Sequence, residues 1–406
     1  MLWLVGIAEL LGTSLWLSGT AVIPQLTTAW GAELAGWAAS WLTMSVQLGF
    51  VAGALASAVF NLPDILHGPR MFAFSALFAA VVNGLFAVVA AEHFWWALIL
   101  RFLTGVAMAG VYPVGMKILS GWFREGRGTA LGVLVGSLTV GKGVPFLLDG
   151  ISELPWRGVI LVSSLLALAA AAMVGLGVKE GPYTLPSPRV DFHQVRAILH
   201  NRRVRLANLG YFGHMWELYS MWTWIALLLA AAAGGRDRGV AVAAFFAIGA
   251  GFVGCYWAGR VSDATGKEPA DASGGDGARI ARRSRVTIIA MAVSGACCLL
   301  VPLTFDVYPL LVAVCIVWGA SVVADSAQFS TIVSEVSDRR YIGTALTMQT
   351  ALGFLLTVVA IRATGAIATA YGWRAAAATM AIGPALGIIA MWRLMAQPSE
   401  DARGEA

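Results

Sequence analysis

The chain has 406 residues, of which 59% are hydrophobic and 12% are charged, whereas soluble proteins have about half and about a quarter. The charged residues are confined to short runs between long apolar stretches, which excludes a water-soluble globule and is typical of a membrane-embedded chain. The four cysteines lie inside apolar stretches, so the sequence indicates neither a disulfide framework nor a metal site.

A helix needs roughly 20 apolar residues to cross the bilayer, and twelve stretches approach that length. The first six are Leu2–Leu26, Gly36–Phe60, Met71–Ala91, Trp95–Gly121, Thr129–Leu148 and Val159–Val178. The second six are Leu206–Ala233, Val240–Gly259, Val286–Phe305, Tyr308–Val333, Ile342–Ile361 and Ala375–Ala396. These runs are too long and too uniformly apolar for the strands of a membrane barrel. The predicted fold is an all-α integral membrane protein with 12 transmembrane helices.

The first stretch, Leu2–Leu26, has no basic n-region and no small-residue cleavage site, so it is predicted to be a spanning helix and not a signal peptide. It begins almost at Met1 without a charged flank. This leaves open a chain that starts upstream of this numbering.

Basic residues are distributed unequally between the two predicted membrane faces. Of the 27 Lys and Arg residues, 20 fall on the side of both termini, 5 on the other side and 2 within spans. Cytoplasmic loops carry the excess of Lys and Arg, so both termini are predicted to be cytoplasmic, in a multi-pass protein of the cell inner membrane. This distribution accounts for the net charge of +5 without a nucleic-acid partner.

Short motifs recur in order at about half the chain length. Gly128-Thr-Ala-Leu131 returns as Gly343-Thr-Ala-Leu346, and Glu9-Leu10 with Trp16 returns as Glu217-Leu218 with Trp224. Such internal repeats are typical of transporters. We predict a six-helix half over 1–180, a basic cytoplasmic linker over 181–205, a second six-helix half over 206–398 and a polar tail over 399–406. A further insert, Glu268 to Arg285, is rich in Gly, Ala, Asp and Arg, and is predicted to be mobile.

The twelve spans and several motifs resemble the major facilitator superfamily, whose fold consists of two pseudo-symmetric halves. The loop signature of that family runs Gly, three residues, Asp, Arg, any residue, Gly and a basic residue. In the second half this pattern is matched by Gly259, Asp263, Gly266 and Lys267, and in the first half only Asp64 and a displaced Arg70 remain. The resemblance implies gating loops at these residues, with a different cytoplasmic gate in the first half.

The fourth predicted span resembles the same family, because Arg101 is followed by the spaced glycines Gly105 and Gly110. In relatives such an arginine is implicated in proton coupling. The fifth span lacks the Gly-Pro step of the antiporter motif, which favours uptake over export. The second span contains no arginine, which argues against the nitrate and nitrite branch.

Six ionisable residues are predicted at bilayer depth, namely Glu9, Arg101, Lys142, His214, Glu217 and Asp325. Each costs at least ~2.5 kcal/mol on insertion scales unless it has a partner, a watery cavity or a proton. With His214 neutral they sum to −1, so one protonated carboxylate would neutralise the set. This sum favours proton coupling over a cavity for multiply charged anions.

Helical spacing puts Glu9 and Trp16 on one face of the first span, and Glu217 and Trp224 on one face of the seventh. In the resembled fold both helices line the central cavity, where a carboxylate near an indole would hold a solute with an apolar body and a polar or cationic group. Glu217, near the membrane middle, is the leading candidate for proton coupling. His214 on the same face either relays that proton, contributes to a metal site or is a satisfied polar residue.

The remaining candidates each have two open interpretations. Arg101, which shares a face with Tyr112, either pairs with Glu9 or faces substrate. Lys142 is either a counter-ion across the interface between the halves or snorkels from a shifted helix. Asp325 is a second proton or substrate residue, while Gln328 is either a site residue or a helix-packing amide.

The predicted function is proton-coupled secondary transport of a small organic solute by alternating access. Proton-driven efflux of amphipathic compounds and a non-transporting receptor of the same fold are the alternatives, with a divalent-metal transporter using Glu9, His214 and Glu217 ranked lower. No P-loop, HExxH or nucleophile elbow is present, so we predict no enzyme and no cofactor. The predicted partners are a small-molecule substrate, protons and the lipid bilayer, and the protein is predicted to be a monomer.

Overall fold

The computed structural model describes residues 1–30, 32–151, 154–183, 195–265, 275–338 and 340–397. Every regular element in these ranges is a helix, which confirms the all-α prediction. Ten helical segments are long and apolar enough to cross a membrane, and the last of them, Ile342–Met395, is 54 residues long.

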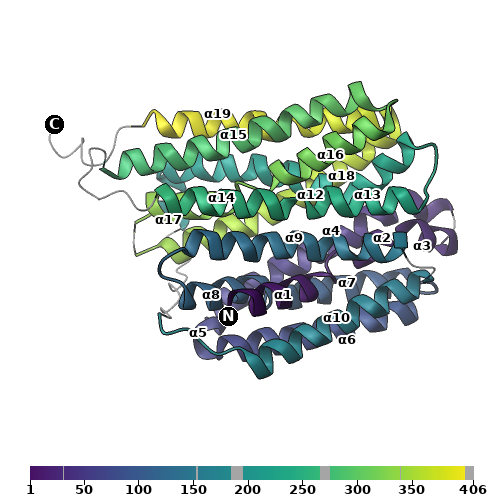
Figure 1. Ribbon diagram of the computed structural model, residues 1–406, viewed down its shortest axis with the longest axis horizontal. Coiled ribbons are helices and arrows are strands. Elements are labelled where there is room, and N and C mark those ends of the chain that lie inside the picture. Colours follow the sequence, from purple (N-terminus) through teal and green to yellow (C-terminus); the bar gives the residue numbers. More distant parts are fainter. Residues whose placement is uncertain (31, 152–153, 184–194, 266–274, 339, 398–406) are drawn as a thin grey trace.

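The helices of the first part of the chain are α1 (Leu2–Thr13), α2 (Ser18–Ala21), α3 (Ile23–Trp30), α4 (Ala32–Val59), α5 (Leu62–Ile65), α6 (Gly68–Val89), α7 (Phe94–Met108), α8 (Tyr112–Trp122), α9 (Arg127–Ile151) and α10 (Trp156–Gly177). The later helices are α11 (Val195–His200), α12 (Arg202–Ala232), α13 (Arg238–Gly249), α14 (Gly251–Thr265), α15 (Gly275–Thr304), α16 (Tyr308–Val322), α17 (Ser326–Val336), α18 (Ile342–Met380) and α19 (Ile382–Met395). Most run along one common direction (Figure 1).

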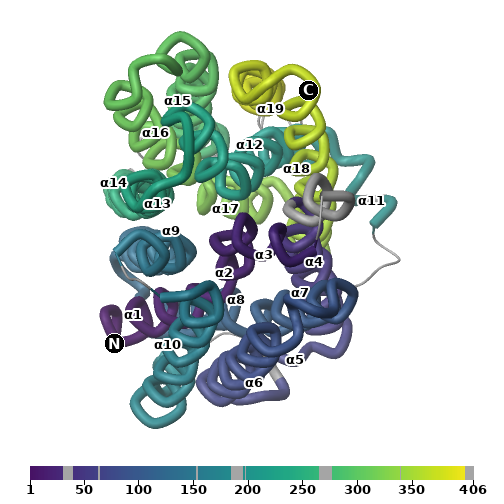
Figure 2. The backbone as a smooth tube through the Cα atoms, turned by 90° about the vertical axis from the view of Figure 1, so that its right-hand side faces the viewer, coloured from purple at the N-terminus to yellow at the C-terminus, as the bar shows by residue number. Residues whose placement is uncertain are grey.

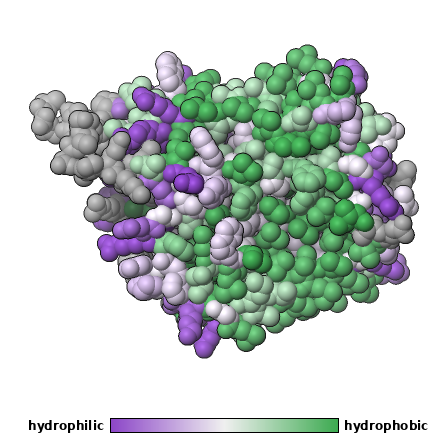
Figure 3. Space-filling model, in the orientation of Figure 1, coloured by the Kyte–Doolittle hydropathy of each residue, from purple (hydrophilic) through white to green (hydrophobic). Residues whose placement is uncertain are grey.

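On the face shown in Figure 3, apolar side chains form a broad band across the middle of the molecule, and polar side chains gather towards its two ends. Large exposed hydrophobic residues such as Leu176, Leu303 and Phe74 are 91%, 79% and 70% exposed. A surface of this kind is stable only against hydrocarbon. The chain is therefore a multi-pass membrane protein.

Viewed along the bundle, the helices up to α10 gather on one side and those from α12 onward on the other (Figure 2). The close approach of α4 and α7 depends on glycine, because a Cβ on Gly49 would lie 1.9 Å from the Phe102 carbonyl oxygen. Small residues allow backbones to approach closely in membrane bundles, where lipid removes the hydrophobic drive for association.

Three predicted spans are interrupted over three or four residues, in ways that periodicity did not reveal. The first span, predicted as Leu2–Leu26, breaks over residues 14–17, and the fourth breaks between α7 and α8 at residues 109–111. Pro113 follows the second break and cannot supply a backbone N–H to the preceding turn. The tenth span likewise breaks at residues 323–325, which leaves Asp325 at the start of α17.

Two predicted boundaries were wrong. The loop expected between Ile342–Ile361 and Ala375–Ala396 is largely helical, and the chain kinks at Gly372, whose φ is 82°. The helix of the ninth span, predicted to begin at Val286, begins at Gly275, inside the insert 268–285. Most of the predicted linker and the polar tail 399–406 lie outside the described residues.

Candidate functional site

The ammonium group of Lys142 lies inside a group of aromatic rings, which we call the aromatic cage. Its Nζ atom is 3.8 Å from the Trp16 ring centroid, 4.2 Å from that of Trp222 and 4.7 Å from that of Tyr219. Nζ also donates a hydrogen bond of 3.0 Å to the Tyr219 hydroxyl. Lys142 is 1% exposed, so the faces of the rings stabilise its charge through cation–π contacts.

The cage joins distant parts of the chain. Trp16 lies in the break between α1 and α2, Lys142 is on α9, and Tyr219 and Trp222 are one turn apart on α12. Lys142 therefore contacts residues from both sides of the bundle. One predicted interpretation placed it at this interface as a counter-ion, but its partners there are aromatic rings and a hydroxyl group. Snorkelling is wrong for this residue because its Nζ is enclosed.

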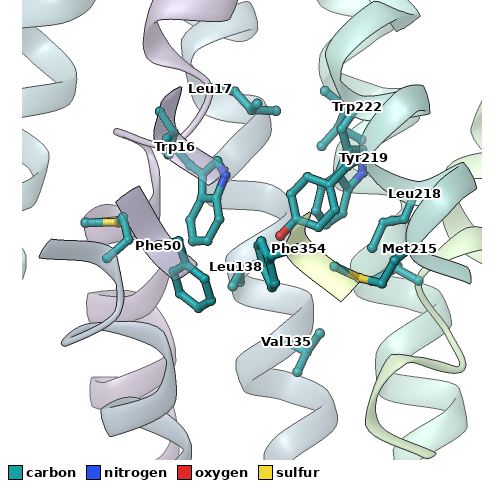
Figure 4. Close-up of a cluster of buried hydrophobic side chains, with 14 of the residues drawn as sticks. Trp16, Leu17, Phe50, Val135, Leu138, Met215, Leu218, Tyr219, Trp222 and Phe354 are labelled. Carbon is teal, nitrogen blue, oxygen red and sulfur yellow. The ribbon is translucent and has the colours of Figure 1, made fainter. Parts of the chain in front are cut away.

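Phe50 on α4 and Phe354 on α18 extend the cluster, with ring centroids 4.4 Å apart. Figure 4 shows both rings beside Trp16 and Tyr219, with Phe50 on the side of Trp16 and Phe354 on the side of Tyr219. Beyond Phe50 lies an open cavity of about 310 Å³. Its lining comes from α4, α8 and α18 and the residues beside them, among them Ala54, Asn61, Pro113, Lys117, Thr347 and Thr350.

Glu9 is fully buried on α1, and neither carboxylate oxygen accepts a hydrogen bond from the described residues. Its surroundings include Gly115, where an added Cβ would lie 2.8 Å from Oε2, and its charge acts through space on Lys142 and Tyr112. An ionised carboxylate in such a place lacks a hydrogen-bonded partner. The geometry therefore fits a residue that holds a proton.

Glu217, at the position in the repeat that corresponds to Glu9, has the opposite environment. Its Oε1 accepts hydrogen bonds from the Trp318 indole at 2.7 Å and the Cys298 thiol at 3.1 Å. Its Oε2 accepts one from Ser294 at 2.8 Å. These three donors come from α15 and α16, so Glu217 ties three helices of one side together.

His214 and Asp325 form a buried pair between α12 and the start of α17. The Nδ1 atom of His214 is 2.8 Å from Asp325 Oδ1, and its Nε2 atom is 2.9 Å from the Ser326 hydroxyl. His214 is thus occupied on both ring nitrogens. Among the described residues no three metal-ligating side chains meet, and the separate surroundings of Glu9, His214 and Glu217 contradict the metal site considered for them.

The predicted pairing of Arg101 with Glu9 is wrong. Arg101 is fully buried and donates to the carbonyl oxygens of Leu15 and Trp16, the Ser18 hydroxyl at 3.2 Å and Asn83 Oδ1 at 3.2 Å. The break after α1 leaves carbonyl groups without helical partners, and in a membrane these must be satisfied internally. Arg101 donates hydrogen bonds to these carbonyl groups, and none of its described hydrogen bonds reaches a substrate cavity.

The other predicted residues lie at varied distances from the cage. The Trp224 indole donates to the Ile361 carbonyl oxygen at 3.0 Å, so this repeat partner of Trp16 is satisfied within its own side. Tyr112 begins α8 and lies within electrostatic range of Glu9. Gln328 accepts a hydrogen bond of 3.1 Å from Arg283, which supports its interpretation as a packing amide.

The loop residue Asp263 connects the two sides at the end of the bundle where α9 begins, which we call the basic end. Its carboxylate accepts hydrogen bonds from the backbone N–H groups of Gly128 at 2.7 Å and Thr129 at 2.8 Å, and from the Thr129 hydroxyl. A carboxylate at a helix N-terminus satisfies free N–H groups and favours the helix dipole. Gly259 allows this approach, because an added Cβ would lie 2.4 Å from the Gly128 carbonyl oxygen.

The four other residues predicted in gating loops have no described contact between the two sides of the bundle. Asp64 falls within α5 but its side chain is outside the described part, and Arg70 is exposed on α6. Gly266 and Lys267 lie outside the described residues.

A contact at the opposite end, called the far end, was not predicted. Arg236, in the loop between α12 and α13, donates to the Asp149 carboxylate and to the Ala21 carbonyl oxygen. Gln25 donates to the same carboxylate at 2.9 Å. A basic residue in a loop gives no periodic signal, and only the opposite charge of Asp149 near the end of a predicted span could have suggested the pair.

Two comparisons with known proteins bear on this arrangement. The profile of the family described as Major Facilitator Superfamily matches residues 2–270. Over 168 residues the chain is 31% identical to a protein of Haemophilus influenzae named as a metabolite transport protein. That alignment covers 40% of this chain and 38% of the relative, so it spans well under half of either protein.

Proposed function

This chain belongs to the Major Facilitator Superfamily, and we propose that it is a proton-coupled secondary transporter of a small organic metabolite. The observation that carries the proposal is Glu9, a fully buried carboxylate without a hydrogen-bonded partner among the described residues, located near an aromatic cage that bridges the two sides of the bundle. The name of the Haemophilus influenzae relative supports a metabolite as cargo.

The proposed architecture is twelve crossings in two six-helix halves, 1–180 and 206–398, joined by a linker over 181–205. The broken first helix and the kink at Gly372 support this count: residues 2–30 form one interrupted crossing, and Ile342–Met395 supplies two. The repeated motifs Gly128-Thr-Ala-Leu131 and Gly343-Thr-Ala-Leu346 begin α9 and α18, as a duplication would require.

We propose that the basic end faces the cytoplasm, with the protein in the inner membrane and both termini inside. The excess of Lys and Arg on that side supports this orientation. The cavity lined by Phe50 would then lie on the cytoplasmic side, where Asp263 also joins the two sides of the bundle, and the Arg236–Asp149 contact would join them on the outer side.

Glu9 replaces Glu217 as the residue to which we assign proton binding. Three hydrogen-bond donors stabilise the ionised form of Glu217, whereas the ionised form of Glu9 has no such donor among the described residues, so of the two buried carboxylates Glu9 favours a bound proton more strongly. Rocking of the halves would alter the access of water to Glu9 and the distance between the Glu9 carboxylate and the Lys142 ammonium. Both changes would link proton release from Glu9 to the conformation of the cage.

The test is proton flux in liposomes that contain the purified protein and a pH-sensitive dye, with chemically diverse solutes added outside. We expect a solute to drive proton movement in the wild type, and Glu9→Gln to reduce that movement to the level of protein-free liposomes, because glutamine mimics the protonated acid and cannot release a proton.

Glu217→Gln is the matched control, since it makes the same chemical change at the corresponding position of the repeat. Its coupled flux should stay within a few fold of the wild type. A Glu9→Gln variant with unchanged flux would remove Glu9 as the proton site, and the absence of flux with every solute would contradict transport itself.

A further inference from the structure

We propose that the substrate is an organic monocarboxylate, held by the Lys142 ammonium and the indole N–H groups of Trp16 and Trp222, with an apolar body against the surrounding rings. This inference rests on the proposed transport function and specifies its substrate class. It departs from the sequence-based expectation of a cationic group beside an acid, because the cage already contains a cation of its own.

The cage contains hydrogen-bond donors without acceptors. An ammonium group has three donor hydrogens, and the one hydrogen bond described for Lys142 goes to Tyr219. The indole nitrogens of Trp16 and Trp222 are buried and donate to no atom of the described residues. Buried polar groups are normally hydrogen-bonded, so a cluster of free donors indicates a ligand that brings acceptors.

The charge at the cage is also unbalanced. Glu9 is the acid whose field reaches Lys142, but its oxygens accept no hydrogen bond from the described residues, Lys142 included. Aromatic faces compensate a buried ammonium only in part. One negative charge next to Nζ would complete the compensation, whereas a cationic solute would be repelled.

Trp16 differs from its repeat-related counterpart in hydrogen bonding. The Trp224 indole donates to the Ile361 carbonyl oxygen, whereas the Trp16 indole has no acceptor among the described residues. Buried donors without acceptors also occur elsewhere, at Trp216, Gln47 and Gln349. The cage differs from these positions because its free indole donors belong to rings that surround a buried ammonium group.

The cavity of about 310 Å³ lies close to the cage, because its lining includes Phe50, whose ring centroid is 5.1 Å from that of Trp16. Phe50 and Phe354 lie on α4 and α18, on opposite sides of the bundle, with ring centroids 4.4 Å apart. Separation of the two sides would part these rings and connect the cavity to the cage. The rings would then offer aromatic walls to the apolar body of the solute.

The experiment measures ligand-induced thermal stabilisation of the purified full chain in detergent, where passive permeation of weak acids through a bilayer plays no part. The probes are benzoate and hexanoate, each compared with the amide and the amine of the same carbon skeleton. We expect the two carboxylates to raise the unfolding temperature of the wild type and the amides and amines to leave it unchanged.

Lys142→Gln should weaken carboxylate binding at least about tenfold, since it removes a buried charge partner, while Lys142→Arg should retain part of the response. Trp16→Phe keeps the ring and removes the N–H, so a several-fold loss is expected there. Trp30→Phe is its control, because the Trp30 indole donates to the Ala90 carbonyl oxygen away from the cage.

Stabilisation by the amines in place of the carboxylates, or a carboxylate response that is equal in wild type and Lys142→Gln, would overturn the monocarboxylate assignment. Neither result would touch the proposed transport function, which fails only if no solute moves protons in the liposome experiment. If Lys142→Gln does not fold, the comparison of Trp16→Phe with Trp30→Phe still decides the point, since equal responses would contradict the proposal.

Discussion

Glu9 and Glu217 illustrate how one residue type takes two roles through its neighbours. Both precede a leucine and lie seven residues before a tryptophan, yet Glu217 accepts hydrogen bonds from Trp318, Ser294 and Cys298, while Glu9 accepts none from the described residues. Buried charge is tolerated in a membrane when it is paired, hydrogen-bonded or neutralised by a proton. The same pattern in sequence therefore supports a structural anchor in one half and a titrating site in the other.

Arg101 is expected to contribute to stability and not to substrate binding. Arg101→Met would remove the guanidinium donor that the Leu15 and Trp16 carbonyl oxygens and Asn83 share, and would leave Ser18 as the described side-chain donor to Leu15 and Asn83, at a cost of about 3 kcal/mol in the free energy of unfolding. Arg101→Lys should lie between the variant and the wild type, since one ammonium cannot reach all four acceptors.

Thermal unfolding of the purified variants measures this effect. Arg374→Met is the control, because the Arg374–Asp306 pair is 49% and 76% exposed and such pairs contribute less than about 1 kcal/mol. An Arg101→Met variant as stable as that control would mean that the break after α1 needs no side-chain donor.

At this scale the sequence predicted the unusual residues better than their partners. All six ionisable residues that were predicted at bilayer depth are buried in the structure. They could be identified because a charge within an apolar run is visible in the sequence. Their partners were mostly missed: Arg101 binds carbonyl groups that are free only because the helix breaks, and Lys142 binds rings that periodicity classified as core. Contacts between distant residues leave no periodic signal in a single chain.

At the scale of elements, the helices approach one another through glycine, and their interruptions create the site. The break after α1 places Trp16 at the cage and exposes the carbonyl groups that Arg101 binds. The long apolar runs predicted the existence of these helices, since the hydrocarbon thickness sets their length. The breaks after α1 and α7 were not predicted because apolar composition is continuous across them, whereas the Gly372 kink lies in the interruption that was predicted between Ile361 and Ala375.

The contact between α4 and α7 gives a test at this scale. Gly49→Ala would place a Cβ 1.9 Å from the Phe102 carbonyl oxygen, so the helices must separate, which costs about 1–3 kcal/mol of stability. Gly235→Ala is the control, since no atom lies within 4 Å of its added Cβ, and its effect should be within about 0.5 kcal/mol. Equal unfolding temperatures for the two variants would show that α4 and α7 do not pack this closely.

At the scale of the whole molecule, contacts between the two sides occur at both ends and in the middle. Asp263 binds the start of α9 at the basic end, Arg236 binds Asp149 at the far end, and the cage lies between them. Alternating access requires that such contacts break in turn, because opening both at once would leave a channel. The two end contacts should therefore oppose one another in their effect on conformation.

Two substitutions test this opposition. Asp263→Asn weakens the hydrogen bonds from the Gly128 and Thr129 N–H groups and should favour opening at the basic end. Arg236→Gln removes the guanidinium donor to Asp149 and Ala21 and should favour opening at the far end. Each contact is a charge-assisted hydrogen bond of about 1.5–3 kcal/mol, enough to shift a two-state population about tenfold or more.

Thiol labelling with a membrane-impermeant reagent, quantified by mass spectrometry of peptides, reads out both ends. Cys255 reports on the basic end, where it packs against Gly132, and Val22→Cys reports on the far end beside Ala21; both positions are buried in the wild type. We expect Asp263→Asn to raise labelling at Cys255 and lower it at position 22, and Arg236→Gln to do the reverse. If each substitution instead raised labelling at both positions, the end contacts would serve overall stability, and the halves would not alternate about the cage.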